Sequence, residues 1–104
     1  MEATWERLQG LVDWLDEKSP VTGDTAKLMR VLKIGEEFGE VAEAVHGAMG
    51  ANPRKGASHT WDDVHKELSD VAITALIALA SLTSDAPKVF DERLQHIVER
   101  VQTS

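Results

Sequence analysis

Apolar side chains recur every three or four residues along most of this chain, which is the spacing of amphipathic helices. No segment alternates convincingly with a period of two. Residue types that cap or end helices lie between the periodic segments, including Asp24-Thr25, Thr60 and the Ser19-Pro20 pair. The pattern predicts an all-α chain with helices at roughly 4–18, 24–49 and 60–82, and a fourth that begins after Pro87.

The two central segments carry continuous apolar seams. On segment 24–49 the seam is expected to comprise Ile34, Phe38, Val41, Val45 and Met49. On segment 60–82 it is expected to comprise Val64, Leu68, Val71, Ala75, Leu79 and Leu82. The connection between them is short and contains the turn residues of Gly50–Gly56. A short connection favours antiparallel packing of the two helices, seam against seam.

The stretch 72–80 is apolar almost all round, so one seam does not account for it. The side chains on its other side have to be covered by the first helix, the last helix or another subunit. They are Ile73, Leu76, Ile77 and Ala80. We therefore expect a single all-α domain spanning residues 1–104, resembling a four-helix bundle, that is completed by homo-oligomerisation.

Composition narrows the class of function. The chain has 104 residues and a net charge of −7, which argues against binding a nucleic-acid polymer or an anionic membrane. It has no cysteine, which removes disulfide and thiolate chemistry and fits a cytoplasmic protein. Its longest apolar run is too short to span a bilayer, and its first residues lack the pattern of a signal peptide.

Two acid pairs with i, i+3 spacing are the most informative feature. Glu37 and Glu40 lie on the second segment, and Glu67 and Asp70 lie on the third. In an antiparallel pair both flank the seam on the same side and at heights that differ by only about 3 Å. Like charges placed in this way suggest a cation between them, and oxygen ligands of this kind suit Mg²⁺, which commonly works on phosphate substrates.

Neighbouring residues supply candidate substrate contacts. Lys33 lies one turn before Glu37, where its amine either offsets acid charge or meets a phosphate. Glu36 is a candidate outer ligand or base. Arg54 and Lys55 in the central loop are candidate phosphate contacts or simply solvated turn residues. Trp61 either stacks a base or packs at the start of its helix.

The string Leu32 to Ala44 (LKIGEEFGEVAEA), followed by Glu67 to Val71 (ELSDV), closely resembles the MazG-like branch of the all-α nucleoside triphosphate pyrophosphohydrolases. That family's pattern is Glu-Glu-x-x-Glu, a spacer, then Glu-x-x-Asp, and the resemblance covers roughly residues 28–82. The Lys-Asn-x-x-Arg-like segment that many relatives carry afterwards has no match in residues 91–100.

The resemblance implies Mg²⁺, with Mn²⁺ as a substitute, held by Glu37, Glu40, Glu67 and Asp70. It also implies hydrolysis of a (d)NTP or related nucleotide to (d)NMP and pyrophosphate by a homodimer or homotetramer. Two other functions are compatible with the residues. One is a non-catalytic helical interaction module that uses its acidic face. The other is a di-iron carboxylate bundle, for which Glu43 and His46 have the Glu-x-x-His spacing.

Overall fold

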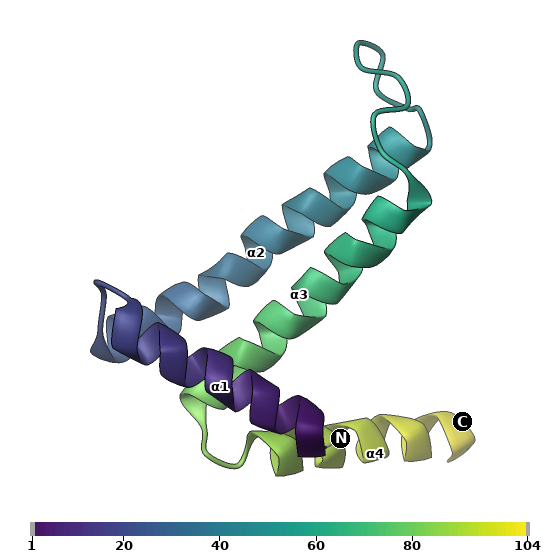
Figure 1. The fold of residues 1–104 in the computed structure, drawn as a ribbon. Coiled ribbons are helices and arrows are strands. Elements are labelled where there is room, and N and C mark those ends of the chain that lie inside the picture. The colour runs from purple at the N-terminus through teal and green to yellow at the C-terminus, as the bar shows by residue number, and fades with distance from the viewer. Residues whose placement is uncertain (1, 104) are drawn as a thin grey trace.

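The computed structural model describes residues 2–103, which form four helices (Figure 1). They are α1 (Glu2–Lys18), α2 (Gly23–Ala48), α3 (Trp61–Leu82) and α4 (Ala86–Thr103). Within residues 2–103 there is no strand, and the prediction of an all-α chain is confirmed. None of the helices in this range combines the length and the apolar character needed to cross a membrane.

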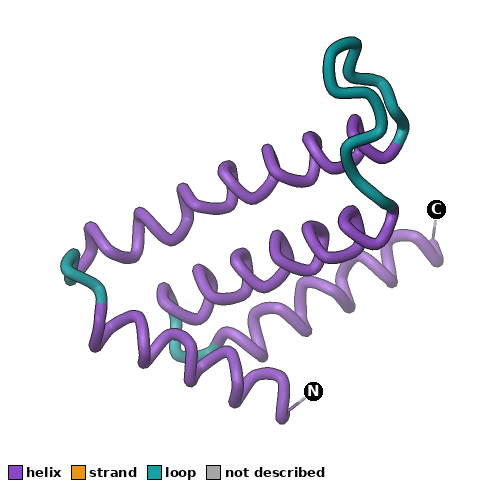
Figure 2. The backbone as a smooth tube through the Cα atoms, turned by 45° about the horizontal axis from the view of Figure 1, so that its top comes forward, coloured by secondary structure: helices purple, strands orange, loops and turns teal. Residues whose placement is uncertain are grey.

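Helices α2 and α3 run antiparallel side by side and form a long hairpin (Figures 1 and 2). Small residues line their contact: Ala44 is fully buried and Ala78 is almost so. Alanine at these positions brings the two backbones close together, because no bulky side chain separates them. This close approach brings side chains on the facing sides of the two helices within reach of one another.

Local signals fix both ends of the hairpin loop. Helix α2 ends in a Schellman motif, in which Gly50 N–H donates to the Gly47 carbonyl and Ala51 N–H donates to the His46 carbonyl. Gly50 has a φ of +65°, a conformation that glycine adopts without strain. Helix α3 begins with a capping box between Thr60 and Asp63.

The box consists of two reciprocal hydrogen bonds. Asp63 N–H donates to Thr60 Oγ1 at 3.2 Å, and Thr60 N–H donates to Asp63 Oδ2 at 2.9 Å. The bond from the Thr60 backbone is the main reason why the pKa of Asp63 lies below its usual value. The predicted start of this helix is therefore confirmed, and it sets the height of Glu67 and Asp70 two to three turns further on.

Helix α1 packs across the hairpin and is held mainly by α3 (Figure 1). Leu8 and Val12 are buried in this contact. Arg30 of α2 ties the three helices together, because its Nη1 lies 2.9 Å from Asp16 Oδ1 on α1 and donates to Ser81 Oγ on α3 at 3.0 Å. The arginine side chain is only 11% exposed, so it lies inside the junction of α1, α2 and α3.

Helix α4 follows α3 after a short loop, and in the view of Figure 1 it points away from the hairpin. Ala86 is buried at its start, and the Phe90 ring meets Trp5 edge to face at a centroid distance of 6.0 Å. The rest of the helix is exposed, with an apolar stripe that includes Leu94 and Ile97. The four helices of one chain therefore do not close into a bundle.

Two sequence predictions about α2 and α3 are wrong. The cap of α2 is Thr22 instead of Asp24-Thr25. The predicted seams included Phe38, Met49, Leu68 and Leu82, yet all four are exposed. On α2, the side that faces α3 carries Arg30, Glu37 and the small side chain of Ala44. The bulkier apolar residues of α2 therefore lie on other sides of the helix.

Candidate metal centre

Three of the four predicted ligands come together in the middle of the hairpin. Glu37 of α2 and Glu67 and Asp70 of α3 each offer a carboxylate oxygen, and these oxygens all lie within 4.8 Å of one another. All three residues are half-buried. Glu67 and Asp70 share one face of α3 because they lie three residues apart, and Glu37 meets them because α2 runs antiparallel at matching height.

This cluster of Glu37, Glu67 and Asp70 is hereafter called the carboxylate triad. Its three carboxylates carry like charges and lie close together. Partial burial raises the pKa of Glu37 and of Glu67, and neighbouring carboxylates, with Glu40 first among them, raise both further. Asp70 contributes to the increase at both glutamates. Lys33 only partly offsets the effect at Glu37. The fold therefore places the ionised carboxylates where their charge is disfavoured unless a cation joins them.

The triad has the dimensions that a hard divalent cation needs. Mg²⁺ binds oxygen at about 2.0–2.1 Å, so two ligands on opposite sides of the ion are about 4.1 Å apart. Neighbouring ligands are about 2.9 Å apart, so oxygens within 4.8 Å of one another have to close by up to about 2 Å, a distance that side-chain rotation covers. Glu67 Oε2 is buried and has no hydrogen-bond partner among residues 2–103, so an acceptor is left for a ligand. The donor set fits magnesium or manganese.

The other two acids of the first motif lie around the triad. Glu40 is exposed and lies outside the triad, but it is near enough to raise the pKa of both glutamates. Glu36 is exposed on the next face of α2. Lys33 Nζ lies 3.8 Å from Glu37 Oε1 and 3.9 Å from Glu36 Oε2, so its amine is at the edge of the triad.

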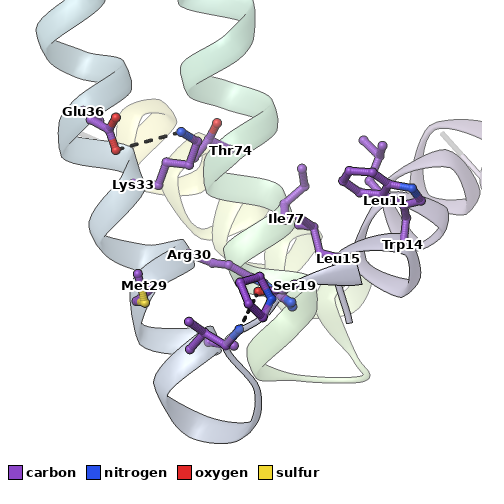
Figure 3. A pocket seen from close by; sticks show the side chains of 13 residues that line it. Leu11, Trp14, Leu15, Ser19, Met29, Arg30, Lys33, Glu36, Thr74 and Ile77 are labelled. Carbon is purple, nitrogen blue, oxygen red and sulfur yellow. Dashed lines mark hydrogen bonds and ion pairs between the residues drawn. The ribbon is translucent and has the colours of Figure 1, made fainter. Parts of the chain in front are cut away.

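A groove of about 570 Å³ opens beside Lys33, bounded by α1, α2 and α3 (Figure 3). Its walls are mostly apolar, with Trp14 and Leu11 contributed by α1 and Ile77 by α3. Lys33 and Glu36 form its polar end, and Figure 3 shows the two side chains paired near Thr74. Arg30 is the third charged residue that lines the groove, and a mostly apolar groove with a few charged groups suits an amphiphilic small molecule.

The remaining predicted substrate contacts lie away from the triad within one chain. Arg54 and Lys55 are in the loop that extends beyond the ends of α2 and α3 (Figure 1). There, both backbone N–H groups donate to Asn52 Oδ1, at 2.9 and 3.0 Å, and hold a tight turn. Trp61 is exposed at the first residue of α3 and is absent from the groove.

The structure also bears on the di-iron alternative. Over residues 2–103 the carboxylate triad is the one group of three or more metal-ligating side chains whose donor atoms converge. Glu43 and His46 do not belong to it, and both are exposed on α2. The Glu-x-x-His spacing is therefore present in the sequence without further ligands around it in one chain.

No family model, no curated protein and no solved structure matches this chain. The resemblance to the MazG-like pyrophosphohydrolases therefore depends on the two acidic motifs themselves. The structure adds an observation independent of that pattern, because residues from both motifs meet in space.

Two residues that shape this region, Arg30 and Trp14, were not among the predicted site residues. Arg30 lies seven residues before Glu37 and so faces α3 from the same side, and this spacing is a usable signal. Trp14 lines the groove from α1, and the sequence gives no signal for it, because neither the rotation nor the crossing of α1 is encoded in local periodicity.

Proposed function

We propose that this protein is a Mg²⁺-dependent nucleotide pyrophosphohydrolase, which cleaves a (d)NTP or a related nucleotide to (d)NMP and pyrophosphate. The observation that carries the proposal is the carboxylate triad, in which Glu37 from one motif and Glu67 and Asp70 from the other converge from two helices. The raised pKa of both glutamates and the unpartnered Glu67 oxygen support a role for a divalent cation at this point.

In this proposal the triad holds Mg²⁺ or Mn²⁺, and Glu40, whose charge acts on both glutamates, is the candidate for a fourth ligand. A bound divalent ion supplies charge neutralisation at the phosphoryl oxygens. Lys33 contacts a phosphate oxygen as a point charge, since its amine lies at the boundary between triad and groove. The apolar groove accepts the nucleoside part, with Trp14 as a flat surface for the base.

The reaction itself needs no side-chain nucleophile. A water molecule attacks the α-phosphorus, a new P–O bond forms, and the bond to the bridging oxygen of pyrophosphate breaks. The proton of the water passes to a carboxylate, for which Glu36 and Glu40 are the candidates because both are exposed next to the triad. Arg54 and Lys55 would contact phosphate only if another subunit brought their loop to the triad, since their own chain holds them apart.

We further propose that the working form is a homodimer or homotetramer. The extensive exposed apolar surface of one chain supports this proposal. The same surface also supports the alternative of a non-catalytic interaction module. That alternative differs in one measurable respect, because it needs no magnesium: a protein that shows no change in thermal stability with Mg²⁺ would favour it.

The experiment that tests the function is a panel of canonical and damaged (d)NTPs with Mg²⁺ or Mn²⁺, scored separately for pyrophosphate and orthophosphate. We expect pyrophosphate as the first product with at least one nucleotide. Glu37→Gln and Asp70→Asn should each abolish turnover and leave helicity intact, whereas Glu43→Gln, an exposed acid outside the triad, should not. Orthophosphate as the first product, or full activity in both triad variants, would contradict the proposal.

A further inference from the structure

The arginine that lines the groove has hydrogen-bond donors that the fold does not use. A guanidinium carries five N–H groups, on Nε, Nη1 and Nη2. In Arg30 the Nη1 atom makes both contacts that hold the junction of α1, α2 and α3, at 2.9 Å from Asp16 Oδ1 and 3.0 Å from Ser81 Oγ. Within residues 2–103, Nε and Nη2 have no hydrogen-bond or ion-pair partner. Three N–H groups of this side chain are therefore left for a ligand.

These unpaired N–H groups open into the groove. In the part of the chain that the structure describes, Glu67 Oε2 is the one enclosed side-chain oxygen or nitrogen without a partner, so Nε and Nη2 of Arg30 are within reach of solvent. Only 11% of the Arg30 side chain is exposed, and the residue lines the groove. The groove is therefore the opening through which a ligand reaches these donors.

The two unpaired nitrogens have a geometry that selects the kind of ligand. Nε and Nη2 lie on one edge of the guanidinium, where their N–H bonds point the same way and can donate to two neighbouring acceptors at once. Asp16 offsets the charge of Arg30, and the groove walls include the apolar Leu15 and Met29. A phosphate brought there would lose its water beside a cation that is already paired. A neutral group with two adjacent acceptors is therefore favoured.

The position of Arg30 along α2 suits the base of a nucleotide whose phosphates lie at the carboxylate triad. At about 1.5 Å per residue, Arg30 lies about 4.5 Å beyond Lys33 and about 10.5 Å beyond Glu37 along the helix axis. Figure 3 shows Lys33 and Arg30 in succession on the wall that α2 contributes, with Trp14 contributed by α1. With a phosphate at Lys33, the sugar spans the interval and the base reaches Arg30.

We propose that Arg30 selects the base, and that the substrate is the nucleotide of a 6-oxopurine such as guanine or hypoxanthine. This inference rests on the proposed function. Guanine presents O6 and N7 as two adjacent acceptors, and arginine donating to both is the commonest specific contact with that base. Adenine has an N6 amino donor in place of O6, so one N–H of Arg30 would face another donor. Cytosine also presents an amino donor there, and thymine presents O4 alone.

The test is kcat/KM with Mg²⁺ for GTP, ITP, ATP and 7-deaza-GTP, which keeps O6 and lacks N7. For the wild type, GTP and ITP should exceed ATP by roughly 5- to 150-fold, and 7-deaza-GTP should lie between them. A ratio of GTP to ATP near one in the wild type would overturn the proposal.

Two variants assign this preference to Arg30. Arg30→Lys keeps a charge beside Asp16 and removes the paired donors, so the ratio of GTP to ATP should fall toward one. Ser81→Ala removes a contact of Arg30 outside the groove and should keep the ratio. Loss of stability lowers the activity on both nucleotides alike, so the ratio does not depend on it. A ratio unchanged in Arg30→Lys would overturn the assignment.

A second measurement separates this inference from the proposed function, because it needs neither metal nor phosphate. Calorimetry should show guanosine binding more tightly than adenosine to the wild type, and Arg30→Lys should lose this preference. Equal pyrophosphate release from GTP and ATP would overturn the choice of base and leave the proposed function standing. If no nucleotide is cleaved, a preference for guanosine that depends on Arg30 would still support the assignment, whereas equal binding of the two nucleosides, or none, would overturn it.

Discussion

The carboxylate of Glu67 destabilises the fold when no metal is bound and is a proposed ligand when Mg²⁺ is present. Replacing Glu67 by glutamine separates these two effects. Gln keeps the shape of the side chain and removes the charge. Because burial and neighbouring acids raise the pKa of Glu67 in the fold, its ionised form is less favourable there than in the unfolded chain. We therefore expect Glu67→Gln to melt at the same or a higher temperature than the wild type at neutral pH without metal.

The sign of this difference follows from the direction of the pKa shift. A carboxyl with a raised pKa in the folded state binds protons more readily there, so its unfavourable contribution is fully present above the folded pKa. It is lost as the pH falls to the unfolded value of 4.5. The advantage of Glu67→Gln over the wild type should therefore shrink as the solution is acidified toward this value.

With Mg²⁺ present, we expect the wild type to have the higher melting temperature of the two proteins. The oxygens of the carboxylate triad lie within 4.8 Å of one another and need to close by up to about 2 Å, so rotation of the side chains is enough to bring them onto one ion. At 100 times its dissociation constant, Mg²⁺ stabilises the folded chain by about 2.7 kcal/mol. For a domain of this size that corresponds to a rise in melting temperature of roughly 11–22 °C.

Loss of a direct ligand should weaken binding by about 100-fold, the upper end of what loss of an outer-shell partner costs. At the same Mg²⁺ concentration the stabilisation of Glu67→Gln then falls to about 0.4 kcal/mol, or roughly 2–3 °C. Differential scanning fluorimetry with and without Mg²⁺ measures both values, and Glu43→Gln is the matched control. If the shift of the wild type survives in Glu67→Gln, or is lost equally in Glu43→Gln, Glu67 is not a ligand of the ion.

Three further results are expected. Mg²⁺ affinity, measured by calorimetry, should increase with pH and binding should release protons, because both glutamates of the triad have raised pKa values and must be ionised to bind; a flat pH profile would count against them as ligands. Thr60→Ala should lower the free energy of unfolding by about 1 kcal/mol in urea titrations through loss of the α3 cap, whereas Thr103→Ala near the chain end should change it little. Arg30→Met should cost on the order of 1.5–3 kcal/mol, because it removes hydrogen bonds to two helices, and Asp16→Asn should cost less because Asp16 is largely solvated; equal losses would contradict this assignment of the junction.

Local sequence signals predicted the elements well. Thr60 begins α3 because its hydroxyl satisfies a free N–H of the first turn, and this depends only on neighbours in the chain. Gly50 ends α2 for an equally local reason. The meeting of Glu37 with Glu67 was also accessible, since antiparallel packing and counting along two regular helices determine it.

The spacing of apolar residues along the sequence could not show which surface each of them packs against. Phe38 and Leu68 have the spacing of core residues, yet they face outward from the chain. Helix α2 carries apolar side chains on more than one face, and a count of spacings merges these faces into one. The position of Trp14 in the groove could not be predicted from the sequence either. It depends on how α1 crosses the hairpin, which is set by tertiary packing at Leu8 and Val12.

The proposed function depends on one divalent cation that carboxylates from two helices bind jointly. Its most direct test is a crystal grown with Mn²⁺, in which anomalous scattering locates the metal without reference to the protein density. We expect a peak between Glu37, Glu67 and Asp70, with an oxygen of each within bonding distance. A fully occupied manganese elsewhere, with these three side chains pointing apart, would contradict it.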